Sequence, residues 1–294
     1  PRYAEAGYTV PNPQDRPTPD IRFEDRYAFE LGGLEVELMA VPGAETNDSL
    51  VLWLPQHRIV LTGNLFGCPF GHFPNLVTIR GDRYRDALTC AAAAQTVLDL
   101  GAELLLYGHH EPVVGAALIR EELTAWRDAV LHVHDAVVAG MNAGKSLQEL
   151  QSTIRLPATC EVGQGYGKVD WSIRAIWENY AGWFKHESTT ELYTVPQSAI
   201  HADLVALAGA DALLQAARAK LDAGRREEAL HFLDILLNAE PEHAGARSLA
   251  IEVHQSLLAD ARIFCTTGNF WLEGWLEESI RRLGGEPGAP LVIR

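Results

Sequence analysis

The sequence is short of basic residues and of long apolar runs, and both shortages exclude classes of protein. It has 24 lysines and arginines against 39 aspartates and glutamates, which gives a formal net charge of −15. Nucleic-acid surfaces need clustered basic side chains, so this balance argues against a nucleic-acid partner. No apolar stretch reaches the roughly 18 residues that a membrane span needs. No basic-then-apolar segment of the secretory type opens the sequence.

Cysteine is also scarce. The four cysteines are far apart and form no C-x-x-C pair: Cys68, Cys90, Cys160 and Cys265. A disulfide framework or a thiolate zinc site would need closer, patterned spacing. We therefore expect reduced thiols and a cytoplasmic location. The hydrophobic fraction of 47% and the charged fraction of 21% are those of a globular protein, and 294 residues leave room for two domains.

Hydrophobic periodicity divides the sequence into three parts. An extended arm over residues 1–20 is predicted by the prolines at 11, 13, 17 and 19. Residues 21–118 are strand-rich, and residues 119–294 are mostly helical by pattern. In the strand-rich part we expect strands at 27–31, 34–39, 49–54, 59–62 and 104–107. One alanine-rich helix is expected at 82–100. The first two strands flank a glycine pair, which predicts a hairpin.

The second half holds three predicted helical segments. Long helices are expected at 119–141 and 171–184, and a helical hairpin is expected at 211–261. The segment 171–184 carries aromatic residues at helical spacing, which we interpret as core rather than as a cofactor-binding face. The hairpin resembles one tetratricopeptide-type unit. Because such a unit seldom stands alone, it is expected to pack on a neighbour or on a second copy of the chain.

The strand 104–107 ends at Gly108 and is followed by His109 and His110. In α/β sheets, ligands bind just beyond the carboxyl ends of strands, and neutral imidazole is the commonest metal ligand. The pattern therefore predicts a site at His109. The alternative is a pair of loop histidines in ordinary hydrogen bonds.

Three more candidates follow predicted strands in the first half: Glu45, Asn64 and Arg80. If these strand ends meet, Glu45 and His109 would supply an oxygen and a nitrogen ligand that suit Zn²⁺. Arg80 would add a planar, permanently charged group for an oxyanion. A glutamate at a turn between strands is otherwise simply solvated. Two ligands also fall short of the three that a catalytic zinc usually has, so this set is incomplete.

At these residues the sequence resembles the alkylsulfatase-like branch of the metallo-β-lactamase superfamily. The matching stretches, in order, are Val41-Pro-Gly-Ala-Glu45, Leu54-Pro-Gln-His-Arg58, Asn75-Leu-Val-Thr-Ile-Arg-Gly81, Gly108-His-His-Glu-Pro112 and Ala181-Gly-Trp183. The resemblance implies the C-terminal half of an αββα metallo-β-lactamase-like α/β domain over residues 21–118. It also implies an all-α dimerisation domain over residues 119–294.

The resemblance also implies roles for single positions. Glu45 and His109 fall on zinc-binding positions of the family, and Arg80 falls on a sulfate-binding arginine. We therefore expect Arg80 to act in catalysis and, with Asn75, to bind substrate. Asn64 replaces a second metal-binding glutamate, and a neutral amide is a weaker ligand, so the site would hold one or two ions, Zn²⁺ or another divalent metal. Trp171 replaces a histidine proposed to assist the leaving group, and indole cannot take that role.

The family's H-x-H-x-D-H metal-binding cluster has no counterpart in this sequence. The nearest string, His132-Val-His134-Asp135, is helical by pattern, and residues i and i+2 of a helix point in different directions. We therefore expect a second polypeptide, separate or cleaved, that carries the H-x-H-x-D-H half and covers the incomplete sheet. The assembly would be a hydrolase in which metal-bound hydroxide attacks an ester, with the helical part pairing two units. The alternative is a repurposed, non-catalytic scaffold subunit.

Two further motifs are weaker. The segment Gly163-Gln-Gly-Tyr-Gly-Lys168 lacks the spacing of a phosphate-binding loop, and we interpret it as a turn that approaches the site. Ser188 has no base partner recognisable in the sequence, which argues against a serine hydrolase. We expect the polar segment around Ser188 to cap a helix, although it could also line the entrance of the site.

Overall fold

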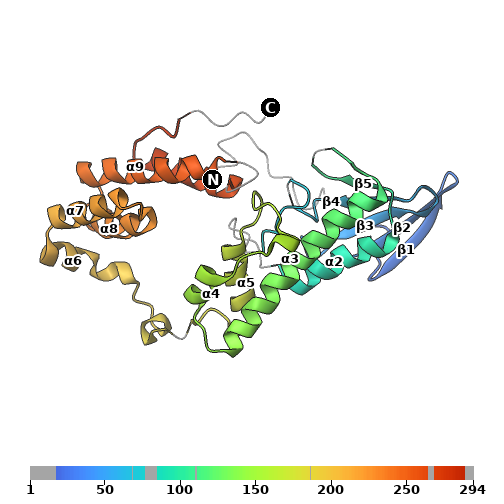
Figure 1. Ribbon diagram of the computed structural model, residues 1–294, viewed down its shortest axis with the longest axis horizontal. Coiled ribbons are helices and arrows are strands. Elements are labelled where there is room, and N and C mark those ends of the chain that lie inside the picture. The colour runs from blue at the N-terminus through green and yellow to red at the C-terminus, as the bar shows by residue number, and fades with distance from the viewer. Residues whose placement is uncertain are drawn as a thin grey trace.

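The computed structural model describes residues 18–67, 69–76, 85–109, 111–185, 187–263 and 268–288. Figure 1 shows a sheet covered by long helices and, at the other end of the molecule, a separate group of helices. Arg80, the predicted catalytic and sulfate-binding residue, lies outside the described residues, as do most of the proline-rich arm, Cys68 and Cys265. Cys90 and Cys160 are free and buried.

The first part of the chain forms one mixed six-stranded sheet with the strand order β1-β2-β3-β4-β5-β6. All neighbours are antiparallel except β4 and β5, which are parallel. The strands are β1 (Arg26–Leu31), β2 (Leu34–Ala40), β3 (Leu50–Leu54), β4 (Ile59–Gly63), β5 (Leu104–Tyr107) and β6 (Val113–Val114). The predicted hairpin and the next three predicted strands are confirmed. The short strand β6 was not predicted, because two residues show no periodicity.

Two long helices cover one face of this sheet (Figure 1). They are α2 (Ala87–Leu100) and α3 (Ala116–Asn142). Small side chains of α2 let it pack closely against α3, and they are buried in one core with Trp53, Val60 and Leu105 from adjacent strands. Asp86 caps α2 by accepting a hydrogen bond from the Thr89 N–H at 2.8 Å. The helix predicted at 82–100 is confirmed from Ala87 to Leu100, and Asp86 is its N-cap.

The opposite face of the sheet is apolar but only half-buried. A row of directly opposed leucines crosses four strands, and its members are Leu38, Leu52, Leu61 and Leu106. Leu50 belongs to the same face and is 43% exposed. Since side chains alternate between the two faces of a sheet, these leucines point away from α2. We call this surface the leucine face.

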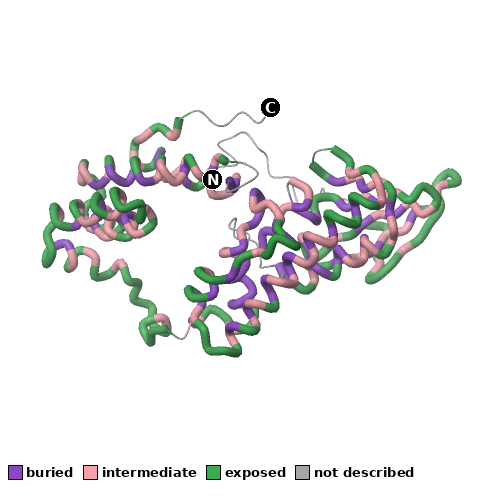
Figure 2. The backbone as a smooth tube through the Cα atoms, viewed as in Figure 1, coloured by how far each residue is buried: buried purple, intermediate pink, exposed green. Residues whose placement is uncertain are grey.

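The core of the sheet continues into the next helices. A single cluster of buried side chains runs from Met39 to Trp177 and includes residues of α3, α4 (Leu147–Thr153) and α5 (Val169–Ala181). Figure 2 shows buried positions along the inner sides of these helices. The expected core role of the aromatic segment on α5 is thus confirmed for Trp177, which is 5% exposed. The division of the chain at residue 118 stays a prediction, and the core is continuous across it.

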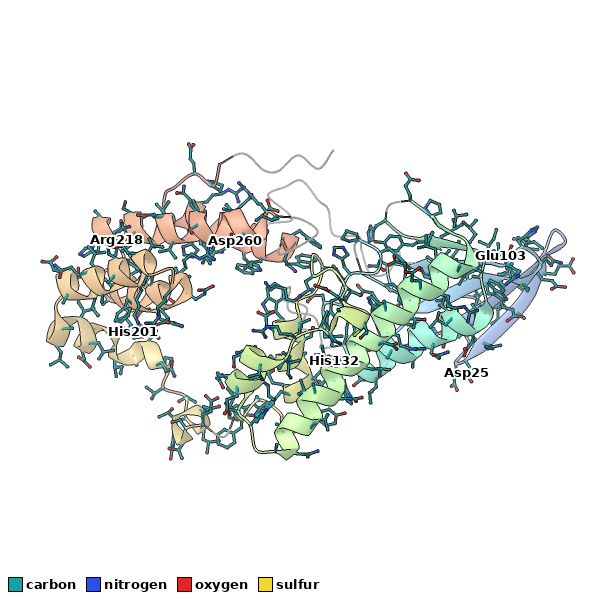
Figure 3. The ribbon with its side chains drawn as sticks, viewed as in Figure 1. Asp25, Glu103, His132, His201, Arg218 and Asp260 are labelled. Atoms are coloured by element: carbon teal, nitrogen blue, oxygen red, sulfur yellow. The ribbon has the colours of Figure 1, made fainter. Side chains whose placement is uncertain are left out.

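The last helices form a group of their own. They are α6 (His201–Ala208), α7 (Ala210–Asp222), α8 (Arg226–Ala239), α9 (Ala244–Ala261) and α10 (Phe270–Arg282). Their buried side chains form two clusters separate from that of the sheet. Surface ion pairs connect these helices, for example Arg218 on α7 with Glu252 on α9, and Figure 3 labels Arg218. The hairpin predicted at 211–261 contains three helices instead of two.

The described helices differ in length and apolar content. No single described helix is both long and apolar enough to cross a membrane, although the bent pair 197–208 and 210–222 has the length and composition when its halves are joined. Between α5 and α6 the chain forms short 3-10 turns, one of which begins at Ser188. Ser188 and Glu191 make a capping box there, as the sequence predicts.

Candidate active site

Three strand ends meet at one edge of the sheet. Because β2 and β4 are each antiparallel to β3, and β5 is parallel to β4, the carboxyl ends of β2, β4 and β5 lie at the same edge. Asn64 and His109 follow the ends of β4 and β5 within two residues, and Glu45 lies five residues after the end of β2. The Gly108 N–H donates to the Gly63 carbonyl at 2.7 Å, which holds the segments of Asn64 and His109 together. The backbones approach so closely that a Cβ on Gly108 would lie 3.2 Å from Gly63.

Glu45 forms a buried ion pair with Arg85. An Nη2 of Arg85 lies 2.6 Å from Oε1 of Glu45, and the two side chains are only 5% and 9% exposed. Asn64 Nδ2 also donates to this Oε1 at 3.3 Å. A buried charge is costly unless it is paired and hydrogen-bonded, so these donors explain how an ionised glutamate is held at the sheet edge.

Arg85 ties the carboxylate to the surrounding backbone. Its Nε donates to the carbonyl oxygen of Glu45 at 2.9 Å, and its Nη1 donates to the carbonyl oxygen of Asn75 at 3.0 Å. Asn75 is itself 1% exposed. Arg85 therefore connects the loop after β2 to the segment of Asn75, because it hydrogen-bonds both Glu45 and Asn75.

A tyrosine from a distant loop completes the surroundings of Glu45. The Tyr166 hydroxyl donates to Glu45 Oε1 at 3.1 Å and accepts from Arg85 Nη1 at 3.2 Å. The Arg85 guanidinium lies over the Tyr166 ring, 5.8 Å from its centre. Burial raises the pKa of the Tyr166 phenol, outweighing the opposing effect of Arg85. The phenol therefore remains a hydrogen-bond donor at neutral pH.

The glycines around Tyr166 permit this approach. A Cβ on Gly167 would lie 2.0 Å from the Pro74 carbonyl oxygen, and a Cβ on Gly163 would lie 2.5 Å from the His72 ring. The Gly167 N–H donates to the Phe73 carbonyl at 2.9 Å. The loop is thus pressed against the segment that precedes Asn75, and the expectation that the glycine-rich stretch is a turn approaching the site is confirmed.

The start of α10 fastens the same loop from the other side. Asn269 is fully buried, and its Nδ2 donates to the carbonyl oxygens of Gln164 and Tyr166 at 2.9 and 3.1 Å. Its Oδ1 caps α10 by accepting from the Trp271 and Leu272 N–H groups. The Phe270 ring stacks on Tyr166 at 6.0 Å. A chain of contacts therefore links the last helix to the carboxylate of Glu45.

His109 lies at this edge with an exposed ring, which meets the ring of Tyr107 edge to face at 5.9 Å. Across the described ranges, no three His, Cys, Asp or Glu side chains gather closely enough to hold a metal ion. Glu45 Oε1 already accepts three hydrogen bonds. The donor set of these residues therefore does not complete a metal centre, and the metal-binding roles of Glu45, His109 and Asn64 stay predictions.

The His132–His134 string is helical, as expected. Both residues lie on α3, where His132 Nε2 contacts the Arg155 carbonyl at 3.0 Å and His134 Nε2 contacts the Tyr180 hydroxyl at 2.7 Å. Figure 3 shows His132 on this helix. The two rings have different partners, so the string does not act as one ligand pair. Trp171 lies in the first turn of α5 and is half-buried.

The sequence did not single out Arg85, Tyr166 or Asn269. Arg85 directly precedes the cap of α2, and Tyr166 stands in the glycine-rich loop that was already expected near the site. The glycine spacing was therefore the available signal for Tyr166. No local pattern distinguishes Arg85 from its neighbouring arginines, or Asn269 from an ordinary helix cap.

Comparison with known proteins matches this architecture. Residues 146–278 match the family model described as alkyl sulfatase dimerisation. A linear primary-alkylsulfatase from a Pseudomonas species is 32% identical over 205 residues, which is 68% of this chain and 38% of that protein. The chain is related to the alkylsulfatases. An alkyl/aryl-sulfatase of Saccharomyces cerevisiae is 26% identical over 255 residues, or 84% of this chain and 39% of that protein.

A solved alkylsulfatase structure has a similar fold. The structure of a stereoselective inverting sec-alkylsulfatase from Pseudomonas sp. superposes with a TM-score of 0.81 at 24% identity, over 93% of this chain and 43% of that one. The fold class expected from the sequence is confirmed, namely part of a metallo-β-lactamase-like α/β domain followed by helices of a dimerisation domain. The chain spans less than two fifths of the length of both curated relatives.

Proposed function

We propose that this chain is one part of a metal-dependent hydrolase that cleaves sulfate esters, and that Glu45 and His109 are its contribution to the metal site. The supporting observation is the preorganised carboxylate of Glu45, held by Arg85 and Tyr166 at the edge where three strand ends meet. The sequence similarity to named alkylsulfatases favours sulfate esters as the substrate class.

The remaining ligands would come from a segment with the H-x-H-x-D-H pattern, which we expect on a second polypeptide. The leucine face supports this assembly, because an apolar sheet face is normally buried against another layer. More than half of each of the two relatives lies outside the match to this chain, which leaves room there for such a segment. It would pack a second sheet on the leucine face and bring its histidines to the same sheet edge as His109.

The roles of this chain's residues follow from their contacts. Arg85 and Tyr166 orient Glu45, since both hydrogen-bond the same carboxylate oxygen. Asn64, which donates to that oxygen, positions the carboxylate and leaves one ligand fewer than the relatives' pattern has. Arg80, the predicted sulfate-binding residue, would bind the sulfate group. Asn75 was predicted to share this role, but it is 1% exposed and its carbonyl oxygen accepts from Arg85, so it would position this segment instead. A bound Zn²⁺, or another divalent metal, would supply an activated water and stabilise negative charge on the ester oxygen.

The test uses this chain mixed with a polypeptide that carries the H-x-H-x-D-H segment. We expect the mixture to hold metal in stoichiometric amount, measured by elemental mass spectrometry, and to release inorganic sulfate from a linear primary alkyl sulfate. Glu45→Gln and His109→Ala should remove the metal and the activity. The matched controls Glu103→Gln and His57→Ala change exposed residues of the same two types and should leave both intact.

A scaffold role is the second candidate. One observation favours it: an amide at Asn64 hydrogen-bonds the expected metal ligand. The family resemblance adds that Trp171 replaces a histidine that would assist the leaving group. In that case no preparation of the mixture would bind metal, while the two polypeptides would still associate. Stoichiometric metal that is lost in Glu45→Gln would exclude the scaffold role.

Dimerisation would use the helical part, as the matched family model suggests. An apolar hollow there is lined by Tyr193, Val195 and Ile200, whose side chains are 73%, 68% and 54% exposed. Monomeric proteins rarely expose such contiguous apolar patches without a partner. We expect Val195→Asp to shift the chain from dimer to monomer in sedimentation experiments, whereas Leu118→Asp, on the exposed side of α3, should not.

A further inference from the structure

A second cluster of reactive groups lies between α3 and α5, on residues without an assigned role. The Tyr180 hydroxyl is 2.7 Å from His134 Nε2, and His134 Nδ1 is 2.8 Å from Asp135 Oδ1. Tyr180 and His134 come from different helices, and their ring centres are 5.8 Å apart. The three side chains thus form one hydrogen-bonded line from an exposed phenol to a carboxylate.

The direction of each hydrogen bond follows from the chemistry of the groups. An ionised carboxylate can only accept hydrogen bonds, so Nδ1 of His134 carries the proton and donates to Asp135. In the neutral ring Nε2 is then the acceptor, and the Tyr180 hydroxyl must donate to it. This is the arrangement of a nucleophile, a general base and an orienting acid that activates hydroxyl nucleophiles on unrelated folds.

In this line the base is buried and the nucleophile is exposed. His134 is 8% exposed, which keeps its ring fixed by packing, whereas Tyr180 is 56% exposed and can meet a dissolved reagent. The side chain of Asp135 is 77% exposed. A purely structural bond between the helices would not need a carboxylate on the far nitrogen of the histidine.

We propose that Tyr180 is a nucleophile that accepts acyl groups from activated aryl esters, with His134 as its general base and Asp135 as a positioning residue. The phenolic oxygen of Tyr180 attacks the ester carbonyl carbon while its proton passes to His134 Nε2. The bond from the carbonyl carbon to the aryl oxygen breaks, and the departing phenolate takes the proton from His134. The products are Tyr180 acyl ester and a free phenol. This activity needs no metal and does not depend on the proposed hydrolase function.

The chain contains its own reference residue. Tyr193 is 73% exposed, more than Tyr180, and its hydroxyl makes no hydrogen bond to another described residue. The purified chain and its Val195→Asp variant, in which Tyr193 is free of the proposed dimer contact, are treated with p-nitrophenyl acetate, and acetylation of each tyrosine is followed by peptide mass spectrometry. We expect Tyr180 to react about 10²-fold faster than Tyr193, the lower end of what a positioned general base contributes.

Two variants separate the relay from simple exposure. In His134→Phe, which keeps an aromatic ring in the helix contact, the rate at Tyr180 should fall to that at Tyr193. In Asp135→Asn, a change at an exposed side chain that preserves folding, the rate at Tyr180 should fall while the rate at Tyr193 stays the same. Equal rates at the two tyrosines in the unmodified chain, or a Tyr180 rate that neither variant lowers, would overturn the proposal.

Discussion

The ion pair of Arg85 and Glu45 links most of the residues around the candidate active site. Its arginine touches Glu45, Asn75 and Tyr166, and both charged side chains are nearly inaccessible. The contribution of such a pair is measured by what happens when one partner is removed, since an uncompensated buried charge then remains.

We expect Arg85→Met to lower the free energy of unfolding by about 3–5 kcal/mol, because it leaves Glu45 buried without its cation. The double variant Arg85→Met with Glu45→Gln should recover part of this loss. Arg218→Met removes an arginine from an ion pair that is about half exposed, and it should change stability little. Urea unfolding followed by circular dichroism measures all three. Equal losses for Arg85→Met and Arg218→Met would contradict the role of burial.

Cys90, next to this site, gives a pH-dependent prediction. Its Sγ donates to the Ala44 carbonyl at 3.2 Å, and burial raises the pKa of the thiol from 9.0 to about 12. Above pH about 9 the unfolded chain loses this proton while the folded chain keeps it. The unfolded state then binds fewer protons, so stability falls as pH rises from about 9 toward 12.

The slope due to Cys90 should approach about 1.4 kcal/mol per pH unit. Comparing the unmodified chain with Cys90→Ala isolates this slope from other groups that titrate in the same range. We expect the unfolding free energy of Cys90→Ala to decline less steeply between pH about 9 and 11. Identical slopes would show that the thiol ionises freely in the folded protein.

The contacts of Glu45 show which parts of a site a sequence can reveal. Its proximity to Asn64 follows from strand order, because both residues come after strands that run in the same direction. Its contacts with Arg85 and Tyr166 join residues 40 and 121 positions apart. Such contacts depend on how loops pack, and loop packing leaves no periodic signal in the sequence.

Among the structural elements, helices and strands with a clear apolar period were predictable, and short or loop-dependent ones were not. The core helices α2, α3 and α5 follow their apolar spacing, and their caps lie within a few residues of the predicted ends. The strand β6 has two residues and is defined only by its pairing with β5. The third helix in 211–261 was missed although Pro241, in the turn between α8 and α9, is a signal that ends a helix.

The glycine loop and α10 offer two glycines with opposite expected effects. A Cβ at Gly167 would overlap the Pro74 carbonyl, whereas Gly274, in the middle of α10, has open space around it. Gly167→Ala should destabilise the fold by about 1–3 kcal/mol through forced backbone shifts. Gly274→Ala should stabilise it by up to about 1 kcal/mol, because alanine favours the helix.

Thermal unfolding checks both signs in one experiment. Since Gly167→Ala moves the loop that carries Tyr166, it should also lower the metal affinity of the proposed assembly, and Gly274→Ala should not. A Gly167→Ala protein as stable as the unmodified chain would show that the loop tolerates displacement.

The molecule as a whole presents one sheet with a helix-covered face and a leucine face. The first face is buried by α2 and α3, while the leucines opposite remain half-buried. A sheet with an apolar face is normally buried on that face by another layer of helices or strands. The proposed second sheet would therefore gain most of its binding free energy from this surface.

Leu50 and Leu88 form a matched pair for testing this idea. Leu50 lies on the leucine face and Leu88 on the outer side of α2, and they are 43% and 44% exposed. A lysine at either position costs little folding free energy, because each side chain already reaches solvent. Only a lysine at position 50 would be desolvated when a second apolar sheet packs against the first, and burying an unpaired charge costs several kcal/mol.

We therefore expect Leu50→Lys to weaken binding of the polypeptide with the H-x-H-x-D-H segment by at least about 100-fold, equivalent to roughly 3 kcal/mol. Leu88→Lys should leave the affinity unchanged. Titration calorimetry measures both, and it should also record a negative heat-capacity change for the unmodified chain, since apolar surface is buried. If both variants bind equally well, the leucine face is not the contact surface. If only Leu88→Lys loses affinity, the partner covers the helical side of the sheet instead.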